Sequence, residues 1–309
     1  MKRTVGLLLL IGFSACTPAE QVFNPANVTP SLSQNIFIAA DGEKLPVRSW
    51  LPKHKPKAIV VALHGFNDYS NGFVSAGTYF KKRGIATYAY DQRGFGETAQ
   101  VGVWGGEGNL KRDAIAFVQM IHKQYPKTPI FLMGESMGGA VTILASAEDE
   151  MPPLAGIILI SPAVWGGESM PVVNRSLLWT FAHIIPNTKM TGKDLKIKPT
   201  NNIPMLRRLS LDPLVIKATR VDAVYGISNL MDSAYAQVEH IKPPILLLYG
   251  GQDQVIPPKP IESVVRHLPK PFDVGFYDEG YHMLTRDIGG ESVLADIADW
   301  IAKHPAHAN

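Results

Sequence analysis

Short apolar runs without alternation recur along the chain. They lie at residues 58–63, 85–90, 130–133, 156–160, 245–249 and 272–277. Strands that are buried on both faces of a parallel sheet have such runs, whereas a strand with one exposed face alternates apolar and polar residues. The pattern therefore predicts a mainly parallel sheet that is covered on both sides.

Helical patterns separate these runs, at residues 110–121, 137–147, 261–267 and 291–303. In the first of them Leu110, Ala114 and Ile121 fall on one helix face, and Asn109 is placed to cap the start of the helix. Strands that alternate with helices predict the α/β class with a doubly wound sheet.

Two parts of the chain depart from this alternation. Near the N-terminus, extended segments flank Asp41-Gly42, and this dipeptide favours a hairpin turn. Between residues 166 and 240 no strand–helix alternation is recognisable, and the apolar patches are interrupted by Pro186, Pro199, Pro204 and Pro213. We expect this stretch to be a helical cap or lid inserted into a core made of residues 35–165 and 241–309. The chain has 309 residues, 46% of them apolar, which suffices for one large domain with an insertion.

The first fifteen residues have the pattern of an export signal. Lys2 and Arg3 precede an apolar stretch over residues 5–13, and small residues follow it. The stretch is too short to cross a bilayer, which takes about 20 residues. Residues 13–16 resemble the lipobox of bacterial lipoproteins, although Phe13 stands where that family usually has Leu. The resemblance implies lipidation of Cys16.

Lipidation would place the protein on a membrane of a bacterial cell envelope. Cys16 is the only cysteine, so an intramolecular disulfide is excluded. Residues 16–34, rich in Pro, Asn and Ser, predict a flexible tether between the anchor and the core. The alternative is an ordinary secretory signal that is cut further on, which would leave a secreted or periplasmic protein.

Charge and ligand spacing exclude several classes of function. The formal net charge is +3, and removal of residues 1–15 takes away Lys2 and Arg3 and leaves +1. This balance gives no argument for a nucleic-acid partner. Histidine and carboxylate residues show no recognisable metal-binding spacing, so we expect no catalytic metal, and the chemistry below requires no cofactor.

Gly-x-Ser-x-Gly at residues 134–138 follows a predicted buried strand and precedes a predicted helix. This context is typical of a nucleophile elbow, in which a tight turn exposes the serine hydroxyl and small residues avoid backbone clashes. The alternative is a glycine-rich turn with an incidental serine. The motif predicts Ser136 as the nucleophile.

A serine nucleophile needs a base and a carboxylate that orients the base, in the chain order Ser, acid, His for this fold. His282 follows the last predicted strand, whereas the other downstream histidines lie in or beside the insertion, on a helix or in the tail. Asp253 follows the strand at 245–249, at a carboxyl end where α/β sites are built. We therefore predict His282 as the base and Asp253 as the acid. Asp278 and Glu279 are rival acids, and a solvated loop is the other interpretation of these two.

An anionic tetrahedral intermediate needs hydrogen-bond donors at its oxygen. The backbone N–H of Met137, after the nucleophile, is one expected donor, and the N–H of Phe66, in the loop after the strand at 58–63, is the other. Gly65 allows close approach of that backbone. We assign no acid–base role to His64.

Five segments carry a resemblance to a known family. They are His64-Gly65-Phe66, residues 91–97 (DQRGFGE), residues 134–139 (GESMGG), Gly251-Gln252-Asp253 and Gly280-Tyr281-His282. Together they resemble the monoacylglycerol lipase and lysophospholipase group of α/β-hydrolases, of the serine aminopeptidase S33 type. The resemblance spans about residues 35 to 303 without the insertion. It implies ester hydrolysis on lipids with one acyl chain, with the insertion as a lid over the acyl site.

Two rival functions stay open at this point. A peptidase of the proline iminopeptidase type uses the same triad but must bind a free amino group, so a carboxylate pair from the insertion would favour it; Glu168, Asp212, Asp222, Asp232 and Glu239 are the candidates. A noncatalytic binding protein on a hydrolase fold is the other, although such proteins commonly lose a member of the triad. Ser136 argues against the related enzymes that use aspartate as nucleophile.

Overall fold

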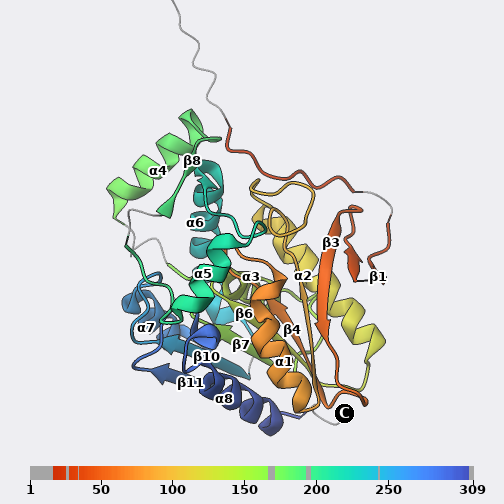
Figure 1. Ribbon diagram of the computed structural model, residues 1–309. Coiled ribbons are helices and arrows are strands. Elements are labelled where there is room, and N and C mark those ends of the chain that lie inside the picture. Colours follow the sequence, from red (N-terminus) through yellow and green to blue (C-terminus); the bar gives the residue numbers. More distant parts are fainter. Residues whose placement is uncertain are drawn as a thin grey trace, which may run out of the picture.

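The computed structural model describes residues 17–25, 28–33, 35–165, 171–192, 196–242 and 244–305. Its centre is a sheet with helices on both faces (Figure 1). The strands are β1 (Ser31–Ser33), β2 (Ile36–Ile38), β3 (Lys44–Trp50), β4 (Ala58–Leu63), β5 (Ile85–Tyr90), β6 (Ile130–Glu135), β7 (Gly156–Ile160), β8 (Lys189–Met190), β9 (Thr219–Arg220), β10 (Ile245–Gly250) and β11 (Phe272–Tyr277). The helices are α1 (Val74–Lys82), α2 (Glu107–Gln124), α3 (Met137–Ser146), α4 (Val172–Ile184), α5 (Ile203–Leu211), α6 (Val221–Ala236), α7 (Pro258–His267) and α8 (Gly290–Lys303), with short 3₁₀ helices η1 (Ser70–Phe73), η3 (Val238–His240) and η4 (Leu284–Arg286).

The strand order is β1-β2-β3-β5-β4-β6-β7-β10-β11. From β5 to β11 all neighbours pair in parallel, and β1, β2 and β3 form an antiparallel meander joined to β5. The α/β class, the doubly wound sheet and the N-terminal hairpin are thus confirmed. Because parallel strands end at the same edge, the loops after β4, β6, β10 and β11 lie together.

Strand β4 shows why the apolar runs do not alternate. Ile59, Val61 and Leu63 belong to one core, which also contains residues of α2, α3, α6 and α7. Val60 and Ala62 point to the opposite face and join a second core with residues of α1 and α8. Both faces of the strand exclude water, so a polar residue on either face would lose its hydration.

Strand β11 differs from the other predicted buried strands. It is the edge strand of the sheet, pairing with β10 on one side only, and the side chains of Val274 and Phe276 are exposed. An apolar run alone does not distinguish an edge strand from a central one, because that difference depends on which neighbours the chain provides.

The predicted cap of α2 is also wrong. The helix begins at Glu107, and its cap position is Gly106, with φ 83°. Asn109 lies inside the helix, where its side-chain amide donates to the carbonyls of Gln21 and Gly105, at 2.7 Å each. A tertiary contact therefore uses the side chain that the local pattern assigned to a cap.

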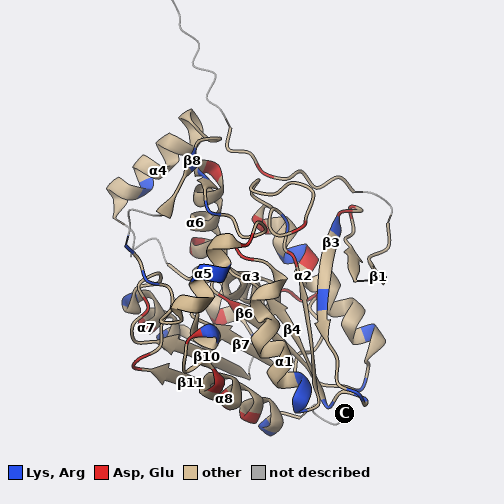
Figure 2. Cartoon of the chain, in the orientation of Figure 1, with Lys and Arg blue, Asp and Glu red and all other residues tan. Residues whose placement is uncertain are grey.

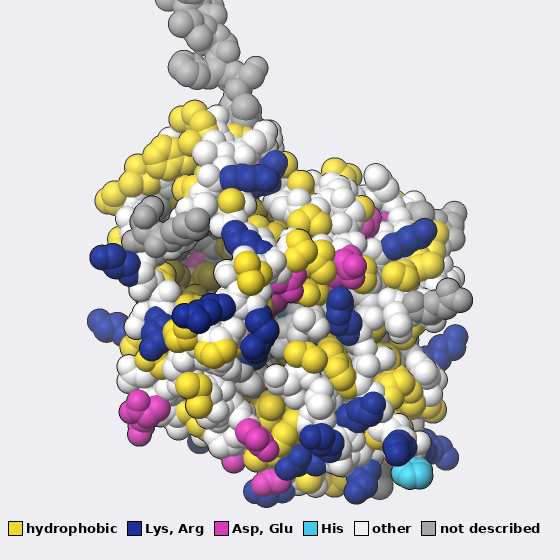
Figure 3. Space-filling view, viewed as in Figure 1, with side chains coloured by type: hydrophobic (Ala, Val, Ile, Leu, Met, Phe, Trp, Pro, Cys, Tyr) yellow, Lys and Arg dark blue, Asp and Glu magenta, His cyan; other side chains and the backbone are white. Residues whose placement is uncertain are grey.

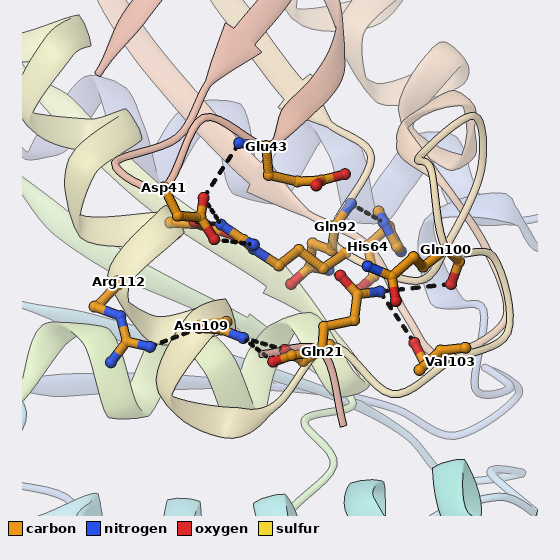
Figure 4. A network of polar contacts seen from close by, with 12 residues as sticks. Gln21, Asp41, Glu43, His64, Gln92, Gln100, Val103, Asn109 and Arg112 are labelled. Atoms are coloured by element: carbon orange, nitrogen blue, oxygen red, sulfur yellow. Dashed lines mark hydrogen bonds and ion pairs between the residues drawn. The ribbon is translucent and has the colours of Figure 1, made fainter. Parts of the chain in front are cut away.

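The partner of Asn109 belongs to an N-terminal segment, residues 19–23, that lies on the core (Figure 4). The Gln21 N–H donates to the Trp104 carbonyl at 2.9 Å, and the Gln21 side chain, only 5% exposed, reaches the carbonyl of Val103. The Ala19 N–H donates to Asp222 at the start of α6, at 3.1 Å. These contacts, and β1, fall inside the range 16–34 that the composition assigned to a flexible tether; Cys16 itself lies outside the described residues.

Between β7 and β10 the chain forms α4, α5 and α6, in the stretch predicted as an insertion. Helix α6 packs on α3 of the core and carries α4 on its other side (Figure 1). The Asn67 side chain donates to Thr219 at 2.7 Å, and the Met283 N–H donates to the Pro199 carbonyl at 2.9 Å. The insertion is therefore hydrogen bonded to the loops after β4 and β11. None of the described helices is both long and apolar enough to cross a membrane.

Candidate active site

Ser136 lies at the turn between β6 and α3, with φ 54° and ψ −118°. A positive φ is costly for a residue with a side chain and persists only where the surroundings fix it. Here the Ser136 N–H donates to the Ile160 carbonyl at 3.0 Å, and the Ser136 carbonyl accepts from Ala163 at 2.9 Å. The turn that Gly-x-Ser-x-Gly predicts is present, and the serine side chain is partly exposed.

Neighbouring glycines are required by close backbone contacts. A Cβ atom on Gly138 would collide with the carbonyl of Leu63, at the end of β4, and one on Gly134 would collide with the carbonyl of Gly138. A Cβ on Gly65 would lie 3.3 Å from the Cβ of Ser136. The loop that holds Gly65 and Phe66 therefore lies directly against the elbow, and Met137 is the first residue of α3. The two predicted oxyanion donors, Phe66 and Met137, thus directly follow Gly65 and Ser136, which lie against each other.

His282 and Asp253 form a buried pair. The distance from His282 Nδ1 to Asp253 Oδ2 is 2.8 Å, and the Asp253 side chain is fully buried. The other carboxylate oxygen, Oδ1, accepts from the N–H groups of Val255 and Ile256, at 2.8 and 3.0 Å. With Oδ1 held by two backbone donors, Oδ2 faces the imidazole and fixes Nδ1 as the protonated nitrogen, which leaves Nε2 free to accept a proton.

The two rival acids are placed differently. Asp278 and Glu279 are both exposed, and among the described contacts neither side chain bonds to His282. The Asp278 carbonyl accepts from the Gln252 side chain, which holds the loop after β10 against the loop after β11. Of the three candidate acids, the structure pairs only Asp253 with the histidine.

His64 is held in a purely structural arrangement (Figure 4). Its Nδ1–H donates to the Gly65 carbonyl at 2.8 Å, and its Nε2 accepts from the Gln92 N–H at 2.9 Å. Burial lowers the pKa of His64, so the ring is neutral. The histidine ties the loop that holds Gly65 and Phe66, called the oxyanion loop below after its predicted role, to the loop after β5, and both ring nitrogens are occupied.

One buried residue of this region, Arg286, is not predicted by any sequence motif. Arg286, four residues after His282, donates to Glu135 and to Asp68. These partners are 151 and 218 residues away along the chain, so no local pattern indicates the contact. Within the described residues, no cluster of three or more His, Cys, Asp or Glu side chains is arranged to hold a metal ion.

This geometry can be compared with known proteins. Residues 54–289, which contain every residue of the site, match the family model described as serine aminopeptidase, S33. The chain belongs to this S33 family. It is 29% identical to the monoglyceride lipase of Rattus norvegicus over 281 residues, which are 88% of this chain and 91% of the lipase.

Two further proteins similar to this chain are monoacylglycerol lipases. The monoacylglycerol lipase of Mycolicibacterium smegmatis is 23% identical over 299 residues, 90% of this chain and 99% of that protein. The crystal structure of Paleococcus ferrophilus monoacylglycerol lipase aligns with a TM-score of 0.69 at 25% identity, over 84% of this chain and 99% of that one. The chain is a serine hydrolase of the α/β-hydrolase fold in a group similar to monoglyceride lipases, and the resemblance inferred from its motifs is confirmed.

Proposed function

We propose that this S33 hydrolase cleaves carboxylic esters of lipids with a single acyl chain, of the monoacylglycerol or lysophospholipid type. The observation that carries the proposal is the buried His282–Asp253 pair, which shares one edge of the sheet with the elbow of Ser136. The similarity to monoglyceride lipases along 88% of the chain supports the substrate class.

In the proposed reaction, Ser136 attacks the ester carbonyl while His282 takes the hydroxyl proton and then gives it to the leaving alcohol. Asp253 keeps the imidazole in the tautomer that can accept the proton. The amides of Phe66 and Met137 stabilise the oxyanion. Water then releases the acyl group by the same route, with His282 again as the base.

Carboxylates of the insertion favour an ester over a peptide substrate. A peptidase of this fold would need a carboxylate pair for the free amino group of its substrate. Instead, Asp212 accepts from Tyr69, Asp222 binds Arg220, and Asp232 binds Arg175. Glu239 lies 4.0 Å from His267. These four are each engaged with a different partner, and Glu168 lies outside the described residues.

Helix α4 offers an apolar surface that suits a lipid substrate. Arg175 is its only Lys, Arg, Asp or Glu residue (Figure 2). Six of its apolar side chains are exposed: Val172, Val173, Leu177, Trp179, Phe181 and Ile184. Figure 3 shows yellow, apolar side chains gathered over α4 at one end of the molecule, beside a hollow in which further yellow side chains are visible. An exposed patch of this kind marks an interaction site more often than a free surface.

The ester hydrolase proposal predicts a dependence on chain length. With chromogenic esters from acetyl to palmitoyl, we expect the rate to peak at medium or long chains, because each buried methylene contributes about 0.8 kcal/mol. Monoacylglycerol and lysophospholipid should be cleaved, and an aminoacyl amide should not. Ser136→Ala gives the background rate. Activity confined to the amide, or equal in the variant, would contradict the proposal.

We further propose that the protein is lipidated at Cys16 and held on a membrane of a bacterial cell envelope. The Ala19 N–H is bonded to Asp222, so the chain from Cys16 to this contact spans about 11 Å at most. The Asp222 N–H in turn donates to the carbonyl of Pro186, two residues beyond the end of α4. An anchor at Cys16 would therefore start close to the apolar face of α4, which supports membrane contact through that face.

Fractionation of cells that express the full chain tests this anchor. We expect wild-type protein in the membrane fraction with labelled palmitate attached, and Cys16→Ser protein in the soluble fraction without label. The Val173→Ser/Ile184→Ser variant of the chain without lipid should bind phospholipid vesicles about tenfold more weakly, since two exposed apolar side chains are lost. Val274→Ser/Phe276→Ser on β11 is the matched control, and equal losses in both variants would exclude a specific role of α4.

A further inference from the structure

We infer that Arg286 is a positioning residue that fixes the three functional loops of the active site relative to one another. Its Nη1 donates to Asp68 Oδ2 at 2.6 Å, and its Nη2 donates to Glu135 Oε1 at 2.5 Å. One side chain thus joins the loop after β4, the last residue of β6 and the segment after β11, and these strands are not all neighbours in the sheet.

Each of the three bridging residues lies close in the sequence to a residue of the proposed mechanism. Glu135 is the last residue of β6 and immediately precedes Ser136. Asp68 is two residues after Phe66, and its backbone N–H donates to the carbonyl of Gly65. Arg286 ends η4, the short helix that begins two residues after His282. A shift of the arginine would therefore move the nucleophile, the oxyanion loop and the base against one another.

Burial makes this bridge rigid. The side chains of Arg286 and Asp68 are each 8% exposed, and that of Glu135 is 3% exposed. Burial alone would lower the pKa of Arg286, but the two carboxylates outweigh it and hold that pKa above its usual range, so the guanidinium stays charged. Because all three side chains are largely shielded from solvent, water competes little for either carboxylate, and the ion pairs favour one arrangement.

The geometry of the guanidinium matters as well as its charge. Two separate nitrogens of Arg286 donate to two separate carboxylates. The ammonium of lysine has a single nitrogen, so it cannot reproduce this forked arrangement. Asp68 Oδ1 is already used by the Tyr69 N–H at 2.8 Å, so Asp68 has a fixed orientation. Lysine at position 286 would keep the positive charge but lose the two-nitrogen geometry. The variant therefore tests whether the geometry of the guanidinium matters beyond its charge.

The molecule contains a matched control for this substitution. Arg93 also joins two buried carboxylates, with bonds to Asp41 at 2.6 and 2.7 Å and to Asp113 at 2.6 and 2.9 Å, and its side chain is 2% exposed. Its carboxylates belong to the turn after β2 and to α2, away from the three functional loops. Arg93 itself is linked to the loop of Gly65 and Phe66 through its neighbour Gln92 and His64, so a lysine at 93 breaks the same kind of bridge while leaving the contacts of Arg286 in place.

The inference rests on the proposed Ser136–His282–Asp253 site and is tested by comparing Arg286→Lys with Arg93→Lys. Both variants should melt at a lower temperature than wild type. In the folded protein, Arg286→Lys should lower kcat and the rate of Ser136 labelling by a serine-directed phosphonate by about tenfold or more, with KM within about twofold. Arg93→Lys, which leaves both contacts of Arg286 in place, should lower both rates much less.

Glu135→Gln, which keeps the shape and removes one charge, gives the same readout if Arg286→Lys does not fold; its labelling rate should fall about threefold. Equal losses in the variants at 286 and 93, or wild-type rates in both Arg286→Lys and Glu135→Gln, would overturn the inference. Labelling of the wild type itself tests the proposed function separately, because that result does not depend on Arg286.

Discussion

Ser136→Ala should abolish hydrolysis of every ester substrate, with kcat falling by roughly 10⁵- to 10⁶-fold, as when a nucleophile is removed from a triad that acts as a unit. The elbow itself needs no hydroxyl, because its bonds are made by the backbone of residue 136 to Ile160 and Ala163. The variant should therefore keep the wild-type melting temperature and bind substrate normally. Steady-state kinetics and thermal unfolding on the same sample check both statements.

Ser146→Ala is the matched control for this variant. Ser146 lies on the same helix as the elbow and is buried, and its hydroxyl donates only to the Thr142 carbonyl, four residues earlier. Its removal should leave kcat unchanged. A phosphonate that labels wild type and Ser146→Ala but spares Ser136→Ala would also rule out a noncatalytic binding protein on this fold.

The second largest effect is expected for Asp253→Asn, with kcat about 10⁴-fold lower at neutral pH. Two backbone N–H groups, from Val255 and Ile256, require an acceptor, so the Asn oxygen should take the place of Oδ1. The Asn amide then points its N–H toward His282 Nδ1 and stabilises the wrong tautomer, in which Nε2 is already protonated and cannot accept the serine proton. The pH dependence of kcat/KM measures this loss.

Asp278→Asn is the control for the second prediction. Asp278 stands close to His282 in the chain, but its side chain is exposed, so its substitution should change kcat by less than about twofold. A large loss for Asp278→Asn together with a small one for Asp253→Asn would contradict the prediction, because Asp278 and not Asp253 would then be the acid that orients His282.

Local sequence was sufficient for the main features of the fold. The runs that form β4, β6 and β10 are recognisable because each strand is buried on both faces, and such burial requires an unbroken run of apolar residues in the sequence. The exposure of β11 and the start of α2 could not be predicted in the same way. The first depends on the absence of a further neighbour for the strand, and the second on a contact between Asn109 and Gln21 across 88 residues.

The residues of the candidate site also differ in whether local sequence predicts them. Ser136 is recognisable because steric limits force glycines at fixed positions around it, and His282 and Asp253 follow strands whose ends must share one edge. Arg286 gives no such signal. Its role arises from three loops that meet only in the folded molecule, and an arginine in a loop is by default a solvated residue.

Strand β11 is the last strand along the sequence and an edge strand of the sheet, which has a consequence for biosynthesis. The elbow and the loop of Gly65 and Phe66 lie in the first half of the chain, whereas His282 and Arg286 are made long after both. Until β11 pairs with β10, Asp68 and Glu135 lack their counter-ion, and the proposed nucleophile Ser136 lacks its proposed base, His282. Closing contacts across such long stretches of chain costs the most entropy and comes late in folding. Under the proposed mechanism, a nascent or unfinished molecule is inert toward esters, and hydrolysis begins only when the sheet is complete.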